Sequence, residues 1–132
     1  MNLLAIDYGS KNIGLAWVNT AVGVVLPFGQ IKNQKFKIQS LLELVERERI
    51  DMIVLGLPLG LDGQENKNTK IVRSFAAELK RVVTVPVEFI DERFTSAQAD
   101  RMESDGVSRD EKAAMVILQT YADSLKHKNI KT

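Results

Sequence analysis

Several acidic residues of the chain stand at the ends of predicted strands or at the start of a predicted helix, where they could bind divalent cations. Asp7 follows the apolar run 3–6, Glu92 follows the predicted strand 87–90 and Asp91, and Asp110 stands near the start of a predicted helix. Three carboxylates brought together would repel one another, and their pKa values would rise unless divalent cations lay among them. A pair of such ions can activate a water molecule and stabilise the leaving oxygen of a phosphodiester. The pattern therefore predicts phosphodiester hydrolysis with Mg²⁺ or Mn²⁺ as the cofactor.

Each of these acids also has a purely structural interpretation. Asp7 could only shape the turn before Gly9, but an acid at the end of a buried strand is costly, which favours a functional role. Within residues 91–93, one acid could pair with Arg93 while the other is solvated. We take Glu92 as the metal ligand, with Asp91 supporting it. The alternative that Asp91 is the metal ligand stays open.

The acids at the start of the last predicted helix differ in their expected roles. Ser108 and Glu111 match the capping-box spacing, in which the side chain of the third helical residue returns to the cap. Acids in a first turn are also stabilised by the helix dipole. Asp110 is therefore the acid left for the site, and the predicted catalytic and metal-binding set is Asp7, Glu92 and Asp110.

The composition limits what else the site can contain. The 132 residues include 18 basic and 17 acidic side chains, which leave a formal charge of +1 and no overall basic field. Any phosphate-binding surface must therefore be local. The chain has no Cys and one His, which excludes disulfides, thiolate metal sites, a cysteine nucleophile and a His-rich metal site.

Basic side chains and loop amides near these acids could meet the phosphates of a substrate. Lys11 lies in the turn after the predicted strand 3–6, and Arg93 follows the predicted strand 87–90 and its two acids. The loop 60–63, after the predicted strand 52–56, offers backbone amides. Each is more often solvated surface when considered alone. The predicted substrate-binding residues are Lys11, Arg93, Gly60, Asp62 and Gly63.

The elements that must position these residues follow from periodicity and turn signals. The predicted strands span residues 3–6, 13–18, 24–31, 52–56 and 87–90, and the predicted helices span 35–49, a segment from about Asn66, a short segment from Thr95 and a segment from Ser108. The first three strands form an antiparallel meander, with Pro27 favouring an edge position or a bulge in the third. The first, fourth and fifth are parallel because helices connect them. This predicts an α/β fold with a five-stranded mixed sheet and helices on both faces, in which ligands bind at the carboxyl ends of the parallel strands.

The length and hydropathy of the chain predict one soluble domain over residues 1–132. No apolar stretch approaches the roughly 20 residues that a membrane span needs. Asp7 interrupts the first apolar run before it could act as a signal peptide. We therefore expect a cytoplasmic protein with no membrane partner.

Four blocks of the sequence, in order, resemble one known family. They are Ala5-Ile6-Asp7-Tyr8-Gly9-Ser10-Lys11-Asn12-Ile13-Gly14; Gly56-Leu57-Pro58-Leu59 with Asp62-Gly63; Asp91-Glu92-Arg93-Phe94-Thr95; and Asp110 followed by Ala113-Ala114 and Ile117-Leu118-Gln119. The chain resembles the YqgF family, also called RuvX, the pre-16S rRNA nucleases and Holliday-junction-resolvase-like proteins of the ribonuclease H superfamily. The match spans nearly the whole chain.

The resemblance implies a ribonuclease H-like fold and an endonuclease that matures the 5′ end of small-subunit ribosomal RNA. It assigns catalytic roles to the first-strand Asp, the acid of the Asp-Glu-Arg block and the Asp of the final helix, which are Asp7, Glu92 and Asp110 here. The expected substrates are precursor rRNA or branched DNA, and ribosomal particles are a further possible partner. The protein itself is expected to be a monomer or a weak homodimer. The alternatives are a Holliday-junction resolvase, and a non-catalytic nucleic-acid or ribosome-binding module that keeps the fold.

Overall fold

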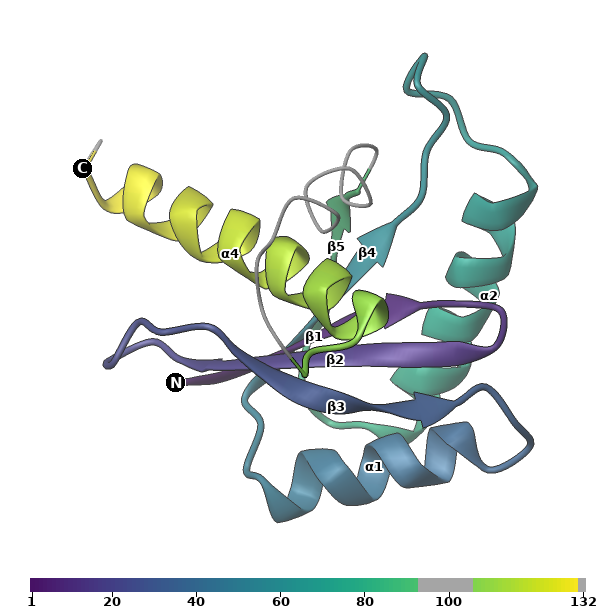
Figure 1. The fold of residues 1–132 in the computed structure, drawn as a ribbon, viewed down its shortest axis with the longest axis horizontal. Helices are drawn as coiled ribbons and strands as arrows, with labels where there is room; N and C mark the ends of the chain where they lie inside the picture. The colour runs from purple at the N-terminus through teal and green to yellow at the C-terminus, as the bar shows by residue number, and fades with distance from the viewer. Residues whose placement is uncertain (93–105, 131–132) are drawn as a thin grey trace.

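The computed structural model of the protein describes residues 1–92 and 106–130, with side chains as far as residue 125. Figure 1 shows the arrangement of the elements. The strands are β1 (Asn2–Tyr8), β2 (Asn12–Asn19), β3 (Leu26–Lys32), β4 (Met52–Leu57) and β5 (Val87–Asp91), and the helices are α1 (Lys37–Arg47), α2 (Lys67–Val82) and α4 (Arg109–Ile130). The short helix predicted from Thr95 lies outside the described residues.

The five strands form one mixed sheet in the order β3-β2-β1-β4-β5. The pairs β1–β2 and β2–β3 are antiparallel, whereas β1–β4 and β4–β5 are parallel. This confirms the predicted meander followed by two parallel strands. Strand β3, which contains Pro27, lies at the edge, and the register against β2 shifts between Gly14 and Ala16. The edge position predicted from the proline is therefore confirmed.

Two element boundaries differ from the prediction near β3. The strand begins at Leu26 and not at residue 24, since Gly23 has a φ of +82° and Val24 is 55% exposed. Helix α1 begins at Lys37 and not at residue 35, because the Lys37 N–H closes a turn onto the Gln34 carbonyl at 3.1 Å. Both residues before the helix are therefore in a turn.

The alternation of side chains along the strands separates two cores. Leu4 and Ile6 of β1 face α1 and α2, whereas Leu3 and Ala5 face α4. In Figure 1, α4 crosses one face of the sheet while α1 and α2 cover the other. Helices on both faces were predicted, and the apolar α4 packs on the sheet with Ala114 fully buried.

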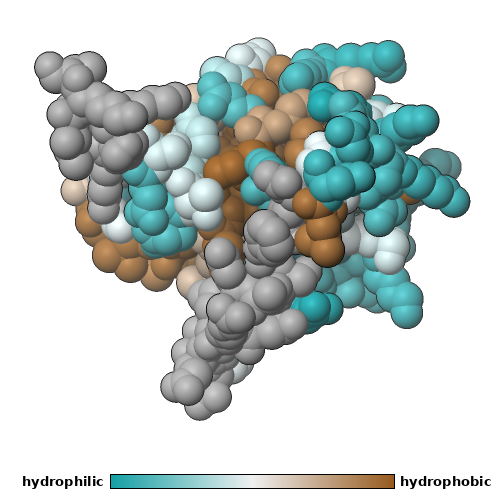
Figure 2. All heavy atoms as spheres, turned by 90° about the horizontal axis from the view of Figure 1, so that it is seen from above, coloured by the Kyte–Doolittle hydropathy of each residue, from teal (hydrophilic) through white to brown (hydrophobic). Residues whose placement is uncertain are grey.

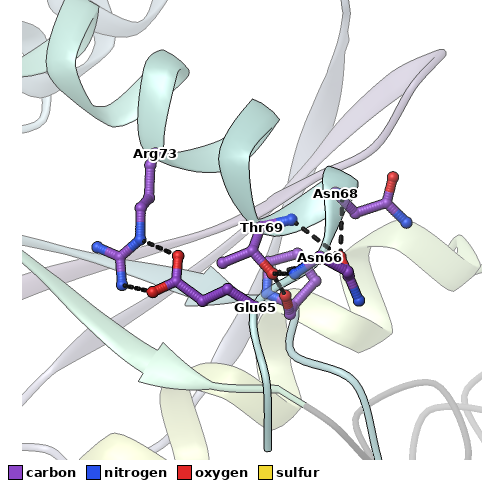
Figure 3. Close-up of polar contacts among 6 residues, drawn as sticks. Glu65, Asn66, Asn68, Thr69 and Arg73 are labelled. Atoms are coloured by element: carbon purple, nitrogen blue, oxygen red, sulfur yellow. Dashed lines mark hydrogen bonds and ion pairs between the residues drawn. The ribbon is translucent and has the colours of Figure 1, made fainter.

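The start of α2 is fixed by polar contacts to the end of β4 (Figure 3). The Asn66 side chain accepts the backbone N–H groups of Asn68 at 3.0 Å and Thr69 at 3.2 Å, while the Asn66 N–H donates to the Thr69 hydroxyl at 3.0 Å. The Thr69 hydroxyl also donates to the Pro58 carbonyl. Because Thr69 is fully buried, these bonds fix the first turn of α2 beside the carboxyl end of β4. Within the described part of the chain, no helix is long and apolar enough to cross a membrane.

Candidate active site

Asp7 lies at the carboxyl end of β1, among two neighbouring strands and one helix. The residues before it, Ala5 and Ile6, are fully buried, so the strand carries Asp7 out of the core at the sheet edge. Ile6 faces α1 and α2, and the alternation of the strand therefore turns Asp7 toward the α4 face. The Asp7 side chain is half-buried there.

A glycine flanks Asp7 on each neighbouring strand. Gly14 of β2 is the direct antiparallel partner of Asp7. On the other side, Ile6 pairs with Leu55 of β4, so that the following residue, Gly56, lies beside Asp7. Glycine inside a strand marks a place where other atoms approach the backbone closely. At both Gly14 and Gly56, atoms of another residue approach the backbone closely.

Asp110 occupies the space next to Gly14, and Glu92 occupies the space next to Gly56. A Cβ atom built on Gly14 would lie 2.0 Å from the backbone oxygen of Asp110 and 2.9 Å from its Cβ atom. A Cβ atom built on Gly56 would lie 2.5 Å from Oε2 of Glu92. The Glu92 N–H donates to the Leu57 carbonyl at 3.2 Å, which holds Glu92 against the end of β4. The structure therefore places Glu92 and Asp110 on the two sides of Asp7, beside β4 and β2 respectively.

The carboxyl groups of Asp7 and Glu92 are hydrogen-bonded to each other. Burial, followed by the charge of Asp7, the hydrogen bond to Asp7 and the charge of Asp91, raises the pKa of Glu92 to about 9. The pKa of Asp7 is also raised, mainly by burial and then by the charge of Asp110, although the hydrogen bond from Glu92 and the charge of Arg109 act in the opposite direction. At neutral pH, Glu92 is therefore protonated and hydrogen-bonded to Asp7.

The donor chemistry of this site suits a hard divalent cation. Its side chains are carboxyl groups, which supply the hard oxygen ligands that Mg²⁺ and Mn²⁺ prefer. Burial raises the pKa values of Asp7 and Glu92, and a bound cation would favour their ionised forms. Among the residues that the structure describes, however, no three Asp, Glu or His side chains are grouped closely enough to hold an ion as they stand. A site shared by all three acids would therefore need a side-chain rearrangement, starting with release of the proton between Asp7 and Glu92.

Glu111 and Ser108 fix the start of α4 and thereby the position of Asp110. The Ser108 hydroxyl donates to Oε1 of Glu111 at 3.0 Å, and the Glu111 N–H donates to the Ser108 hydroxyl at 3.1 Å. The predicted capping box is confirmed. Oε2 of Glu111 also accepts the backbone N–H of Gly29 at 2.8 Å, which ties α4 to the edge strand. Glu111 therefore positions the helix, as its predicted capping role implied.

The predicted substrate-binding residues are distributed over the same edge of the sheet. Lys11 is exposed in the turn between β1 and β2. In the loop between β4 and α2, the Gly60 N–H donates to the Gln64 carbonyl at 2.9 Å, and the Gly63 N–H donates to the Gly60 carbonyl at 2.8 Å. Both amides are therefore hydrogen-bonded within the loop in this structure, and their contact with phosphate stays a prediction.

Asp62 has a structural role in the same loop, since its Oδ1 atom accepts the Gln64 N–H at 2.9 Å. This is the behaviour of an acid that stabilises a turn. The predicted residue Arg93 lies outside the described residues. Asp91 ends β5 as an exposed residue paired with Leu57, so Glu92 is the acid that contacts Asp7.

Sequence reasoning missed several features of the site. Arg109, whose charge acts on Asp7, directly precedes Asp110 and could have been found as a cation in the same helical turn. The glycines beside Asp7 interrupt strand patterns, which signals close approach, but their partners are distant in sequence. A pocket of about 260 Å³ also adjoins the site, and its lining residues are Tyr8, Ser10, Pro58, Asn68, Ile71, Val72 and Glu92.

The surface above this edge is not uniformly polar. Figure 2 shows hydrophilic residues gathered on one side of the molecule, with hydrophobic residues reaching the surface beside them. Leu61 in the loop after β4 is 76% exposed, and Ile71 of α2 is 44% exposed. Ile71 lines the same pocket as Glu92, so an apolar group is accessible beside that carboxyl group.

Comparison with known sequences identifies relatives over nearly the whole chain. Residues 1–124 match the family model described as "RuvX: Holliday junction resolvase". A protein of Dictyoglomus turgidum named "Putative pre-16S rRNA nuclease" is 40% identical over 95% of this chain and 96% of its own length. A protein of Rickettsia africae with the same name is 36% identical over 95% of this chain and 88% of its own length.

Solved structures share the fold at low sequence identity. The RuvC protein of Thermus thermophilus in complex with a Holliday junction substrate has a TM-score of 0.67 at 15% identity, covering 96% of both chains. The Fowlpox virus resolvase in complex with Holliday junction DNA has a TM-score of 0.58 at 15% identity, covering 95% of this chain and 99% of the resolvase. The sheet and helices described above therefore form a ribonuclease H-like fold.

Proposed function

Since this chain belongs to the RuvX family, we propose that it is a metal-dependent endonuclease that processes the 5′ end of precursor 16S rRNA. The observation that carries the proposal is the group of acids around Asp7, where Glu92 shares a proton with Asp7 and Asp110 adds its charge. The relatives from Dictyoglomus and Rickettsia, which align over nearly the whole chain, support rRNA as the substrate.

The three acids Asp7, Glu92 and Asp110 would hold Mg²⁺ or Mn²⁺. The bound ions would activate a water molecule and stabilise the leaving oxygen of the phosphodiester. To bind an ion through its carboxylate, Glu92 would have to lose its proton, so a bound cation would favour the ionised form of this side chain. The close approach of the Asp110 backbone to Gly14 supports this assignment, because it holds the start of α4 beside β2, and the charge of Asp110 acts on Asp7. The positive charge of Arg109 partly offsets the repulsion between Asp7 and Asp110 when no metal is bound.

Holliday-junction resolution is the second candidate function. It is supported by the description of the matched family and by the two solved structures, both of which hold Holliday junctions. Resolution of a four-way junction needs two paired cuts and hence two copies of the site. A protein that stays monomeric at working concentration would therefore count against this function. A non-catalytic binding module is disfavoured because all three acids are present.

One experiment separates these functions. The protein is incubated in parallel with precursor 16S rRNA and with a four-way DNA junction, each with Mg²⁺, with Mn²⁺ or with a chelator. We expect metal-dependent cleavage of the precursor near the mature 5′ end and no paired cuts in the junction. Paired cuts in the junction alone would assign the protein as a resolvase. Binding of both substrates without cleavage under any metal would assign it as a binding module.

A further inference from the structure

The segment between Tyr8 and Leu42 has an unusual charge distribution for a protein with nearly balanced charges. No Asp or Glu occurs in it, although the whole chain contains 17. It does contain Lys11, Lys32, Lys35 and Lys37. A near-neutral protein can bind a polyanion only through such a local concentration of positive charge.

The fold brings these lysines to one place beside the candidate active site. Asn12 pairs with Lys32 in the β2–β3 ladder, and the Asn33 N–H donates to the Lys11 carbonyl at 2.8 Å. The turn after β1 and the turn before α1 are therefore held together, and both lie on the same side of the molecule in Figure 1. The ammonium group of Lys37 lies 5.7 Å from the ring centroid of Tyr8, the residue that follows Asp7.

An exposed aromatic ring lies in the middle of the lysines. Phe36 is 70% exposed, and the ammonium group of Lys35 lies 5.6 Å from its ring centroid. Phe36 is also the N-cap residue of α1, a position that favours Ser, Thr, Asp or Asn, and it makes no side-chain cap bond. The ring therefore stabilises neither the core nor the helix end.

A pocket lies next to this ring. Its volume is about 310 Å³, and it is lined by Ile31, Lys32, Gln34, Phe36, Lys37 and Ser40. The first turn of α1 contains no acidic residue, so its backbone amides and helix dipole also favour an anion here. An exposed ring, flanking lysines and an adjoining hollow together match the way proteins bind single strands, by stacking bases and neutralising phosphates.

We propose that Lys11, Lys32, Lys35, Phe36 and Lys37 form a binding platform for a single-stranded part of the nucleic-acid substrate, next to the site of cleavage. A base stacks on Phe36, and the lysines contact the phosphates of the same strand. The proposal rests on the proposed nuclease function for the identity of the ligand. It places the bound strand on the α1 side of Asp7. The contact between Lys37 and Tyr8 links the platform to Asp7.

The test measures binding without cleavage. Fluorescence anisotropy of labelled oligouridine is recorded in chelator at several salt concentrations. We expect Phe36→Ala to weaken binding by about five- to 150-fold, the range for losing one stacked base, and Phe36→Trp to restore it. The double variant Lys32→Ala/Lys35→Ala should reduce the slope of log affinity against log salt by about 1.4, since each phosphate contact on a single strand contributes about 0.7.

Matched controls separate the platform from general charge and apolar surface. Arg47→Ala/Arg81→Ala removes the same charge from the last turns of α1 and α2, and Val22→Ala trims an exposed apolar residue in the β2–β3 turn. Both controls should bind as the wild type does. The proposal would be overturned if the two charge variants lost the same binding affinity, or if Phe36→Ala bound oligouridine as the wild type does. Equal affinity of the wild type for duplex RNA and oligouridine would overturn it as well.

The platform and the nuclease function can fail separately. If cleavage depends on Asp7 but Phe36→Ala binds oligouridine with unchanged affinity, the platform is wrong and the nuclease function stands. If no substrate is cut but oligouridine binding depends on Phe36 and the lysines, the function is wrong and the platform stands. Circular dichroism of each variant confirms that binding is compared among folded proteins.

Discussion

The two faces of the sheet use opposite kinds of residues at the carboxyl ends of the central strands. Toward α1 and α2, β1 and β4 present the buried side chains of Ile6 and Leu55. Toward α4, the next positions are Asp7 and Gly56, with Gly14 beside them on β2. Large aliphatic groups on one face supply stability, while glycines on the other leave space for the backbone of Asp110 and the carboxyl group of Glu92. The same strand ends therefore serve folding on one side and chemistry on the other.

The largest expected effect that tests this division is on the α4 face. Asp7→Asn keeps the size of the side chain but removes a charge that a divalent cation needs, so cleavage should fall by about a thousandfold or more. Stability should hold or rise, because the repulsion from Asp110 is relieved. Single-turnover cleavage and thermal unfolding measure both, with Asp123→Asn on α4 as the matched control. Wild-type cleavage by Asp7→Asn would disprove the metal-carboxylate mechanism.

The opposite face should show the reverse behaviour. Leu55→Ala removes a fully buried side chain, which should lower the free energy of unfolding by about 2–5 kcal/mol. Cleavage per folded molecule should change little, because Leu55 points away from the acids. Urea denaturation and active-site titration at low temperature give the two quantities. A large loss of activity in fully folded Leu55→Ala would show that the faces are not separable.

Gly14→Ala should affect both stability and activity. Its Cβ atom would collide with the backbone of Asp110, so α4 must shift, at a cost of about 1–3 kcal/mol typical of overpacking. The shift should also reduce cleavage, because it moves Asp110 away from Asp7. Gly29→Ala is a useful comparison, since a Cβ atom at Gly29 meets nothing but is strained by its φ of +85°. Strain without a shift of α4 should lower stability and spare cleavage.

The protonation of Glu92 makes the stability of the metal-free protein depend on pH. The pKa of this carboxyl is about 9 in the folded protein and about 4.5 when unperturbed. A raised pKa means that its contribution is fully present below about pH 4.5 and is lost as the pH rises toward about 9. The melting temperature in chelator should therefore fall across this window, and Mg²⁺ should reverse the fall more strongly at higher pH. In Glu92→Gln this part of the pH dependence should disappear.

The smallest expected effect concerns the cap of α4. Ser108→Ala removes the hydroxyl that accepts the Glu111 N–H, which should cost about 1 kcal/mol. Because Glu111 also accepts the Gly29 N–H, a modest loss of cleavage should accompany this change as Asp110 becomes less fixed. Denaturant titration measures the first effect and cleavage kinetics the second. Ser108→Thr, which keeps the hydroxyl, should retain both properties.

Most of the fold could be predicted because its signals are local. Apolar runs identified the strands, helical spacing identified the helices, and the short connections fixed which strands are antiparallel. The acids Asp7, Glu92 and Asp110 followed from their places at strand ends and a helix start. Their convergence could be expected because the carboxyl ends of parallel strands share one edge.

The remaining features depend on contacts between residues distant in sequence. Gly14 and Gly56 are visible as glycines in strands, but nothing local shows that Asp110 and Glu92 fill the space beside them. The hydrogen bond between Asp7 and Glu92 depends on side-chain placement within the folded site. The hydrogen bonds of the Gly60 and Gly63 amides within their own loop could not be predicted either, because the sequence of the loop alone does not show which donors it satisfies itself.

The bidentate role of Glu111 has a consequence for the dynamics of the molecule. One of its oxygens closes the cap of α4, and the other accepts the amide of Gly29 on the edge strand. Opening of that strand and fraying of the helix start are therefore coupled into one cooperative unit. The Gly29 amide should exchange slowly with solvent for an edge-strand position, and its exchange rate should report on the order of the segment that carries Asp110. A backbone amide far from the acids in sequence thus becomes a probe of whether the site is assembled.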